Sequence, residues 1–136
     1  MRERFRTARC ILYRGDEYLL AVHSSFRRSR DRRWGLPGGQ IEWGETPRIA
    51  AQRELKEELE VVVPELIEVG AYSYKRALHM VYAAPLTGEI GSYDSSELLA
   101  VQWFTEADVA ALQREQALHA NYELEAIRRL KRQLGT

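Results

Sequence analysis

The sequence predicts an α+β domain in which helices pack on a mixed β-sheet. Strand-like apolar segments stand on both sides of a strongly helical segment, and an amphipathic helix pattern closes the chain. The length agrees, because 136 residues with 45% apolar content suit one compact core. No repeat, low-complexity tract or linker divides the sequence, so residues 1–136 are interpreted as a single domain.

The first part of the chain has the pattern of a β-hairpin followed by a glycine turn. Residues 7–13 and 18–23 read as two strands joined by the turn at 14–17. A polar loop at 24–33 follows and holds five arginines. Residues 34–39 then predict a short strand that ends in a turn with two adjacent glycines.

The strongest helix signal starts at Thr46-Pro47, with Thr46 as N-cap and Pro47 at the first helical position. We expect the helix to run over 47–59. Small side chains at Ala50 and Ala51 are expected to leave room for ions on the glutamate side. The expected buried face is Ile49, Leu55 and Leu59, roughly opposite Glu54, Glu57 and Glu58.

The second half of the chain predicts more strands and two helices. The strands are expected at 66–74, 77–84 and 100–104. A short helix is expected at 105–112, with Thr105 as a possible N-cap, and an amphipathic helix at 121–134. The residues expected on the inner face of this last helix are Leu124, Ile127, Leu130 and Leu134.

Composition narrows the class of protein. No apolar run approaches the roughly 20 residues that span a bilayer, and the start of the chain lacks a signal-peptide pattern. The single cysteine, Cys10, cannot form an internal disulfide and is expected to be a buried thiol. These features predict a cytoplasmic protein that does not act at a membrane.

Charge is unevenly distributed although the formal net charge is zero. Residues 1–34 hold ten arginines against four acidic residues, and residues 39–70 hold eight glutamates against three basic residues. Such a division suits a polyanion that arginines hold while metals rest on carboxylates. It also fits two halves that simply attract each other in the fold.

Three glutamates fall within one turn of the predicted helix, at Glu54, Glu57 and Glu58. Positions i, i+3 and i+4 share a face, so these carboxylates repel each other unless a cation lies among them. Oxygen ligands favour hard cations such as Mg²⁺ or Mn²⁺. A metal-binding acidic helix behind a glycine turn indicates phosphate chemistry.

The spacing of these residues resembles a known family. Gly39, five residues, Glu45, seven residues and then Arg-Glu-Leu-x-Glu-Glu at 53–58 is similar to the Nudix box of the Nudix hydrolases. Glu97 and the later Trp103-Phe104 also resemble that family, so the likeness covers most of the chain. It implies an α-β-α sandwich with the box helix and the C-terminal helix packed on the mixed sheet.

The resemblance implies a role for each box residue. Glu54, Glu57 and Glu58 would bind a divalent metal, together with the backbone carbonyl of Gly39. Glu97 would be a fourth ligand or the general base, a role for which Glu54 is the alternative. Arg53 and Glu45 would brace the loop against the helix. Gly38 would shape the turn.

Substrate contacts are expected outside the box. Arginine binds phosphate through two parallel hydrogen bonds, and four arginines of the loop are candidates: Arg27, Arg28, Arg32 and Arg33. Tyr74 is the chosen candidate for stacking on a base, beside Tyr72, Trp43 and Phe26. The three histidines lie far apart without ligand spacing, and we interpret them as core or surface residues.

One position departs from the family pattern. The family usually has glycine where this chain has Glu60, at the end of the box helix. If the turn keeps a positive φ there, a glutamate costs about 1 kcal/mol. The alternative is a helix that ends in a different way.

The predicted function is a Mg²⁺- or Mn²⁺-dependent hydrolase that cleaves the pyrophosphate of a nucleoside diphosphate linked to another group. A nucleoside triphosphate, a nucleotide sugar and a dinucleoside polyphosphate all remain as substrates. A neutral chain without a basic stripe argues against nucleic acid. The alternatives are a Nudix-fold module that senses a nucleotide without turnover and a structural domain. Relatives are often homodimers, so a homodimer is an option.

Overall fold

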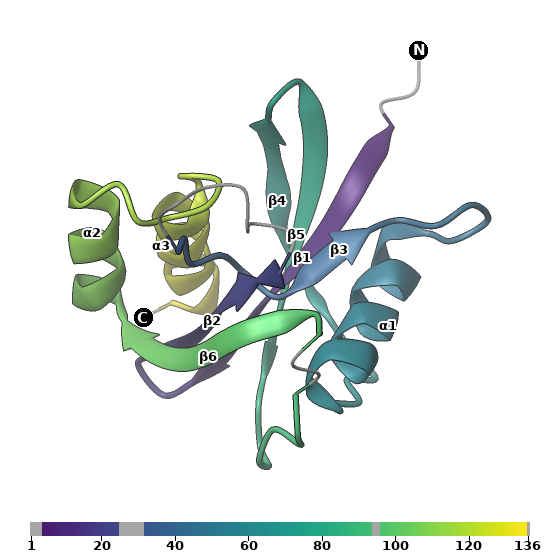
Figure 1. The fold of residues 1–136 in the computed structure, drawn as a ribbon, viewed down its shortest axis with the longest axis horizontal. Helices are drawn as coiled ribbons and strands as arrows, with labels where there is room; N and C mark the ends of the chain where they lie inside the picture. Colours follow the sequence, from purple (N-terminus) through teal and green to yellow (C-terminus); the bar gives the residue numbers. More distant parts are fainter. Residues whose placement is uncertain (1–3, 25–31, 94–95, 136) are drawn as a thin grey trace.

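The computed structural model describes residues 4–24, 32–93 and 96–135. In these ranges the predicted order of strands and helices is confirmed (Figure 1). The elements are β1 (Phe5–Arg14), β2 (Glu17–His23), β3 (Gly38–Gln40), α1 (Pro47–Leu59), β4 (Ile67–Tyr74), β5 (Ala77–Pro85), β6 (Leu98–Thr105), α2 (Glu106–Arg114) and α3 (Glu123–Leu134).

The six strands form one mixed sheet with β1 at its centre. The strand order is β4-β5-β1-β2-β6, and the short β3 pairs with β1. β1 and β5 are parallel, whereas the other pairs are antiparallel. Because β6 pairs with β2, residues near position 98 come beside the end of the first hairpin, His23 opposite Leu98.

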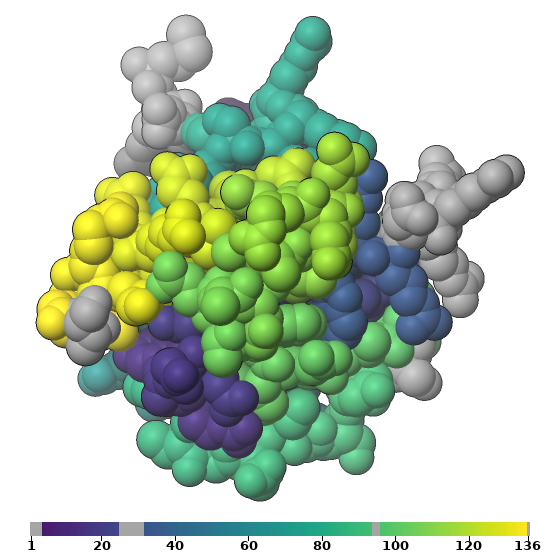
Figure 2. All heavy atoms as spheres, turned by 90° about the vertical axis from the view of Figure 1, so that its left-hand side faces the viewer, coloured from purple at the N-terminus to yellow at the C-terminus, as the bar shows by residue number. Residues whose placement is uncertain are grey.

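Helices cover both faces of the sheet, which confirms the predicted α-β-α sandwich. α1 lies on one side of the sheet, and α2 and α3 lie on the other (Figure 1). Figure 2 looks onto the second side, where α2 and α3 form the surface in front of the strands. Successive strand residues point to opposite faces, so β1 sends Cys10 to the core beside α1 and Ile11 to the core beside α3.

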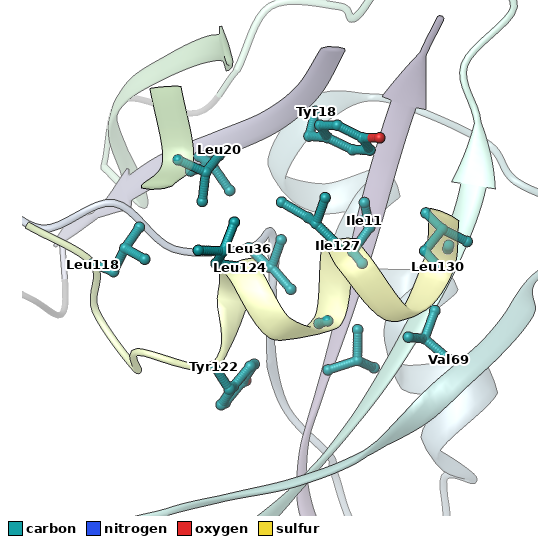
Figure 3. Close-up of a cluster of buried hydrophobic side chains, with 14 of the residues drawn as sticks. Ile11, Tyr18, Leu20, Leu36, Val69, Leu118, Tyr122, Leu124, Ile127 and Leu130 are labelled. Atoms are coloured by element: carbon teal, nitrogen blue, oxygen red, sulfur yellow. The ribbon is translucent and has the colours of Figure 1, made fainter. Parts of the chain in front are cut away.

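The core beside α3 follows from the helical spacing of its apolar residues. Leu124, Ile127 and Leu130 are buried and face the strand residue Ile11 (Figure 3). Leu134 was expected on the same face but is 41% exposed, because it is the last helical residue and no further turn shields it. The helix also begins two residues later than predicted, at Glu123.

The burial of α1 differs from the prediction. Thr46 caps the helix as expected, accepting a 3.2 Å hydrogen bond from the Ile49 amide. Ile49 itself is 52% exposed, whereas Ala50 and Ala51 belong to the core and line no ion site. Their small side chains fill the face of α1 that packs on the sheet, and Ile49, about 100° around the helix axis from Ala50, points outward.

The backbone decides two remaining predictions, the short strand at 34–39 and the helix end at Glu60. The segment 34–39 forms isolated bridges at Trp34 and Gly35, and the strand proper starts at Gly38. Glu60 adopts the left-handed conformation with φ 56°, so the helix ends as it would with glycine. The described helices were also compared with the requirements of a membrane span. None of them is long and apolar enough to cross a membrane.

Candidate active site

The two glycines of the turn lie in close contact with neighbouring groups, and at Gly38 only glycine fits easily. Gly38 has φ 141° and lies so close to β1 that a Cβ atom would collide with the backbone of Ala8 and Arg9. At Gly39 a Cβ atom would lie 2.7 Å from Oε1 of Glu54. The turn therefore brings the main chain directly against the first carboxylate of α1.

Three carboxylates meet beside this turn. Glu54, Glu58 and Glu97 each offer a ligand oxygen, and these atoms all lie within 4.8 Å of one another. α1 supplies the first two, and Glu97 arrives through the pairing of β2 with β6, where its carbonyl accepts a 2.8 Å hydrogen bond from the Ser24 amide. An all-oxygen donor set fits a hard cation such as Mg²⁺ or Mn²⁺.

Burial and mutual repulsion act on these carboxyl groups. Burial, and next the charge of Glu58, raise the pKa of Glu54 to about 7. Glu58 is only 3% exposed, contrary to the expectation that all three helix glutamates lie opposite the buried face. Its Oε1 accepts a 3.0 Å hydrogen bond from the amide of Gly38, which ties the carboxylate to the turn.

Glu57 lies apart from this group. Its side chain is 50% exposed, and Oε2 lies 3.1 Å from Nη1 of Arg53. Within the described residues, the cluster of three carboxylates is completed by Glu97 rather than by Glu57. A ligand role for Glu57 stays a prediction.

Arg53 joins the helix to the loop before it. Its Nε and Nη2 donate to the two carboxylate oxygens of Glu45 at 2.6 and 2.9 Å, and Nη2 also donates to the carbonyl of Gln40 at 3.1 Å. Nη1 donates to Oε1 of Glu54 at 3.0 Å. The hydrogen bond from Arg53 holds the pKa of Glu45 below its ordinary value. A single guanidinium thus connects the loop, the turn and the first carboxylate.

A pocket of about 400 Å³ opens over the carboxylates. Part of its wall consists of the three clustered glutamates, and a second part consists of rings, Tyr74, His79 and His119. The Tyr74 ring lies 5.0 Å from that of His119 and 5.6 Å from that of His79, centroid to centroid. The volume lies in the range of small-molecule sites.

The three histidines, which the sequence indicated only as core or surface residues, come together in space. His23, His79 and His119 all line this pocket, because β2, β5 and the segment before α3 meet there. Burial lowers the pKa of His79 to about 4 and that of His119 to about 3, so both rings are neutral at pH 7. Nδ1 of His79 lies 2.6 Å from the Tyr122 hydroxyl. Residues so far apart in sequence carry no spacing signal.

Arg9 is a pocket residue that the sequence analysis missed. It stands in the middle of β1, and its Nη1 donates to the carbonyls of Gly38 at 2.8 Å and Leu36 at 3.3 Å. The signal was present in the sequence, because an arginine that stands between the apolar residues Ala8 and Cys10 must find partners when it is covered.

Some of the predicted substrate-binding residues line the pocket and others do not. Tyr74 lines the pocket, whereas Arg32 is exposed and neither it nor Arg33 is among the lining residues. Tyr72 is a core residue stacked on Tyr122, and Trp43 is fully exposed. Three candidates lie outside the described residues: Phe26, Arg27 and Arg28.

Comparison with known proteins agrees with this fold. The family model for the NUDIX domain matches residues 3–126. A MutT-like protein from Streptomyces ambofaciens is 34% identical over 102 residues, which are 74% of this chain and 63% of that protein. The chain thus spans less than two thirds of that relative.

Solved structures share the architecture. The MutT NUDIX hydrolase from Burkholderia pseudomallei superposes with a TM-score of 0.75 at 24% identity, covering 92% of this chain and 99% of that one. The NUDIX domain of NrtR from Shewanella oneidensis, solved with ADP ribose, has a TM-score of 0.72 at 22% identity, covering 98% and 90%.

The sandwich and the carboxylate site behind a glycine turn define a domain of the Nudix class. The chain belongs to the Nudix family, as the family model and the relative at 34% identity show.

Proposed function

We propose that this member of the Nudix family is a hydrolase that cleaves the pyrophosphate bond of a nucleoside diphosphate linked to another group, with Mg²⁺ or Mn²⁺ as cofactor. The observation that carries the proposal is the convergence of Glu54, Glu58 and Glu97 in one pocket with neutral aromatic rings. The carboxylates suit the metal and phosphate part of such a complex, and the rings suit a planar base.

The proposed reaction is an in-line displacement at phosphorus. A water oxygen forms a bond to phosphorus, the bridging P–O bond breaks, and the leaving phosphate carries away the electron pair. A bound divalent metal would supply charge neutralisation and would lower the pKa of the attacking water. Glu54, Glu58 and Glu97 would hold it, with Glu57 and the Gly39 carbonyl as further proposed ligands.

The water proton needs an acceptor within the pocket. Glu54 and Glu97 both remain candidates for the general base. The pKa of Glu54, about 7, favours Glu54, because a base works best when its pKa lies near the operating pH. Arg53 donates one hydrogen bond to Glu54 and another to Glu45. Because Glu45 anchors the guanidinium, Arg53 fixes the orientation of the Glu54 carboxylate.

The substrate is proposed to be a nucleotide, for which Tyr74, His79 and His119 offer a stacking surface. The NrtR domain, solved with ADP ribose, supports a nucleotide-type ligand for this fold. A nucleoside triphosphate, a nucleotide sugar and a dinucleoside polyphosphate each satisfy this chemistry. The proposed phosphate contacts of Arg27, Arg28, Arg32 and Arg33 rest on their charge.

The test is a panel of nucleotides incubated with the purified chain, with both products identified by mass spectrometry. We expect turnover that requires Mg²⁺ or Mn²⁺ and stops with a chelator. Glu58→Gln should lose at least about tenfold in turnover, because it removes one charge from the metal site. Glu65→Gln, which changes an exposed glutamate outside the pocket, is the matched control and should retain wild-type turnover.

The same panel decides against the alternative. A module that senses nucleotides would bind one or more of them tightly in the presence of Mg²⁺ and release no product. That result for the wild-type chain would reject the hydrolase proposal.

A further inference from the structure

The carboxylate of Glu58 has a buried histidine beside it. His23, the last residue of β2, places Nδ1 3.3 Å from Oε2 of Glu58, and the two side chains are 6% and 4% exposed. The other oxygen of Glu58 accepts the hydrogen bond from the Gly38 amide. Two separate elements, β2 and the glycine turn, therefore contact the two oxygens of one carboxylate.

Hydrogen-bonding rules decide which ring nitrogen carries hydrogen. Nε2 of His23 lies 3.5 Å from Nη1 of Arg9 and 3.3 Å from the carbonyl of Leu36. Arginine can only donate, so in the neutral ring Nε2 accepts from Arg9 and Nδ1 carries the hydrogen. In a protonated ring both nitrogens carry hydrogen, and Nε2 donates to the carbonyl of Leu36. In both forms Nδ1–H points at Glu58.

The opposite tautomer could donate Nε2–H to the carbonyl of Leu36, but the contacts with Glu58 and Arg9 disfavour it. It would place the lone pair of Nδ1 against a carboxylate oxygen, and it would direct Nε2–H into the space that the Arg9 donor occupies. Two buried acceptors in contact cost free energy, because neither regains the hydrogen bond it had with water. The surroundings thus fix the direction of the donor as well as the place of the ring.

We propose that His23 is a positioning residue that holds Glu58 in the orientation in which it receives a divalent cation. This inference rests on the proposed function, because it takes Glu58 as a metal ligand. A glutamate has three rotatable side-chain bonds, and ordering them when a metal binds costs entropy. A carboxylate that is already fixed by His23 and Gly38 loses less freedom on binding.

The test compares two substitutions that carry the same amide group. In asparagine the amide nitrogen can occupy the place of Nδ1, whereas in glutamine it reaches only the place of Nε2. We expect His23→Gln to weaken Mn²⁺ binding about 10- to 100-fold, the usual effect of losing a group that orients a ligand. His23→Asn should retain most of the wild-type affinity. Isothermal titration with Mn²⁺ alone measures both.

A control separates positioning from general damage to the pocket. His79 is another buried histidine of the same pocket, and its Nδ1 contacts Tyr122. We expect His79→Gln to bind Mn²⁺ as tightly as the wild type. Equal Mn²⁺ affinity in the wild type and His23→Gln would overturn the inference, as would equal losses in His23→Asn and His23→Gln or a comparable loss in His79→Gln.

The measurement needs no substrate, so it is independent of the nucleotide panel. A wild-type chain that binds Mn²⁺ but hydrolyses no nucleotide contradicts the proposed function alone. Wild-type turnover together with unchanged Mn²⁺ affinity in His23→Gln contradicts the positioning role alone. Thermal unfolding of each variant confirms that the compared proteins are folded.

Discussion

At the scale of single residues, Glu54 combines two effects that act in the same direction. Burial disfavours its charged form, and the neighbouring Glu58 carboxylate repels that charge further. Arg53 opposes both through its 3.0 Å hydrogen bond, but the pKa still rises to about 7. At such a carboxyl group a cation competes with a proton near neutral pH.

This competition predicts a pH dependence of metal binding. A metal must displace the proton of Glu54. Below about pH 7, each further unit by which the pH falls therefore weakens metal binding. We expect Mn²⁺ to bind roughly tenfold more weakly at pH 6 than at pH 8, as measured by isothermal titration. Glu54→Gln has no such proton and should bind more weakly at both pH values, with a smaller difference between them. An equal difference in the two proteins would contradict this assignment.

At the scale of elements, the C-cap of α1 is Glu60, where the family usually has glycine. The backbone there has the left-handed conformation that glycine would adopt. Glu60 is left-handed at φ 56°, and its amide bonds to the carbonyls of Leu55 and Lys56. Its carboxylate then accepts a 2.9 Å hydrogen bond from the Ser92 amide. The side chain therefore links the box helix to the loop before β6, which glycine cannot do.

Two substitutions at this cap separate strain from the link. Glu60→Ala loses the hydrogen bond and keeps the left-handed strain, so we expect about 1 kcal/mol of destabilisation. Glu60→Gly also loses the bond but removes strain of about 1 kcal/mol, part of which the greater freedom of glycine in the unfolded chain offsets. The free energy of unfolding, from denaturant titration, should be greater for Glu60→Gly than for Glu60→Ala. The reverse order would show that the left-handed conformation costs nothing here.

The elements also show how far the sequence determined the site. Thr46-Pro47 and the glutamate spacing predicted α1 and the acidic cluster, because capping and helical periodicity are local properties. Local pattern gave no place for Glu97, which was named only through the family resemblance, since it reaches the cluster through the pairing of β2 with β6. The error at Ile49 has a similar cause, because the sheet and not the helix decides which side of α1 is covered.

At the scale of the whole molecule, the pocket lies where separate parts of the sandwich meet. β1 contributes Arg9, β2 His23, α1 the two helix glutamates, and the segment before α3 His119. This explains why charge and spacing along the chain predicted the carboxylate part of the pocket but gave no signal for its histidine rings. Strand pairing assembled the latter from residues that share no local pattern.

Folding buries histidines in their neutral form. The free energy of unfolding of the whole domain should therefore depend on pH. Burial, and next the charge of Arg9, lower the pKa of His79 from an ordinary 6.5 to about 4. The unfolded chain takes up a proton near pH 6.5, whereas the folded chain resists it until about pH 4. The stability that neutral His79 contributes is thus present above pH 6.5 and is lost progressively as the pH falls toward 4.

A comparison of variants isolates this contribution from the other titrating groups. We expect the advantage of the wild type over His79→Gln in free energy of unfolding to shrink as the pH falls from 7 to 4. Tyr122→Phe removes the 2.6 Å hydrogen-bond partner and keeps the histidine, so its difference from the wild type should change little over this range. Denaturant titrations at several pH values measure both differences. A constant advantage over His79→Gln would mean that the ring titrates alike in the folded and unfolded states, and an advantage that grows as the pH falls would mean that the ring is charged in the folded protein.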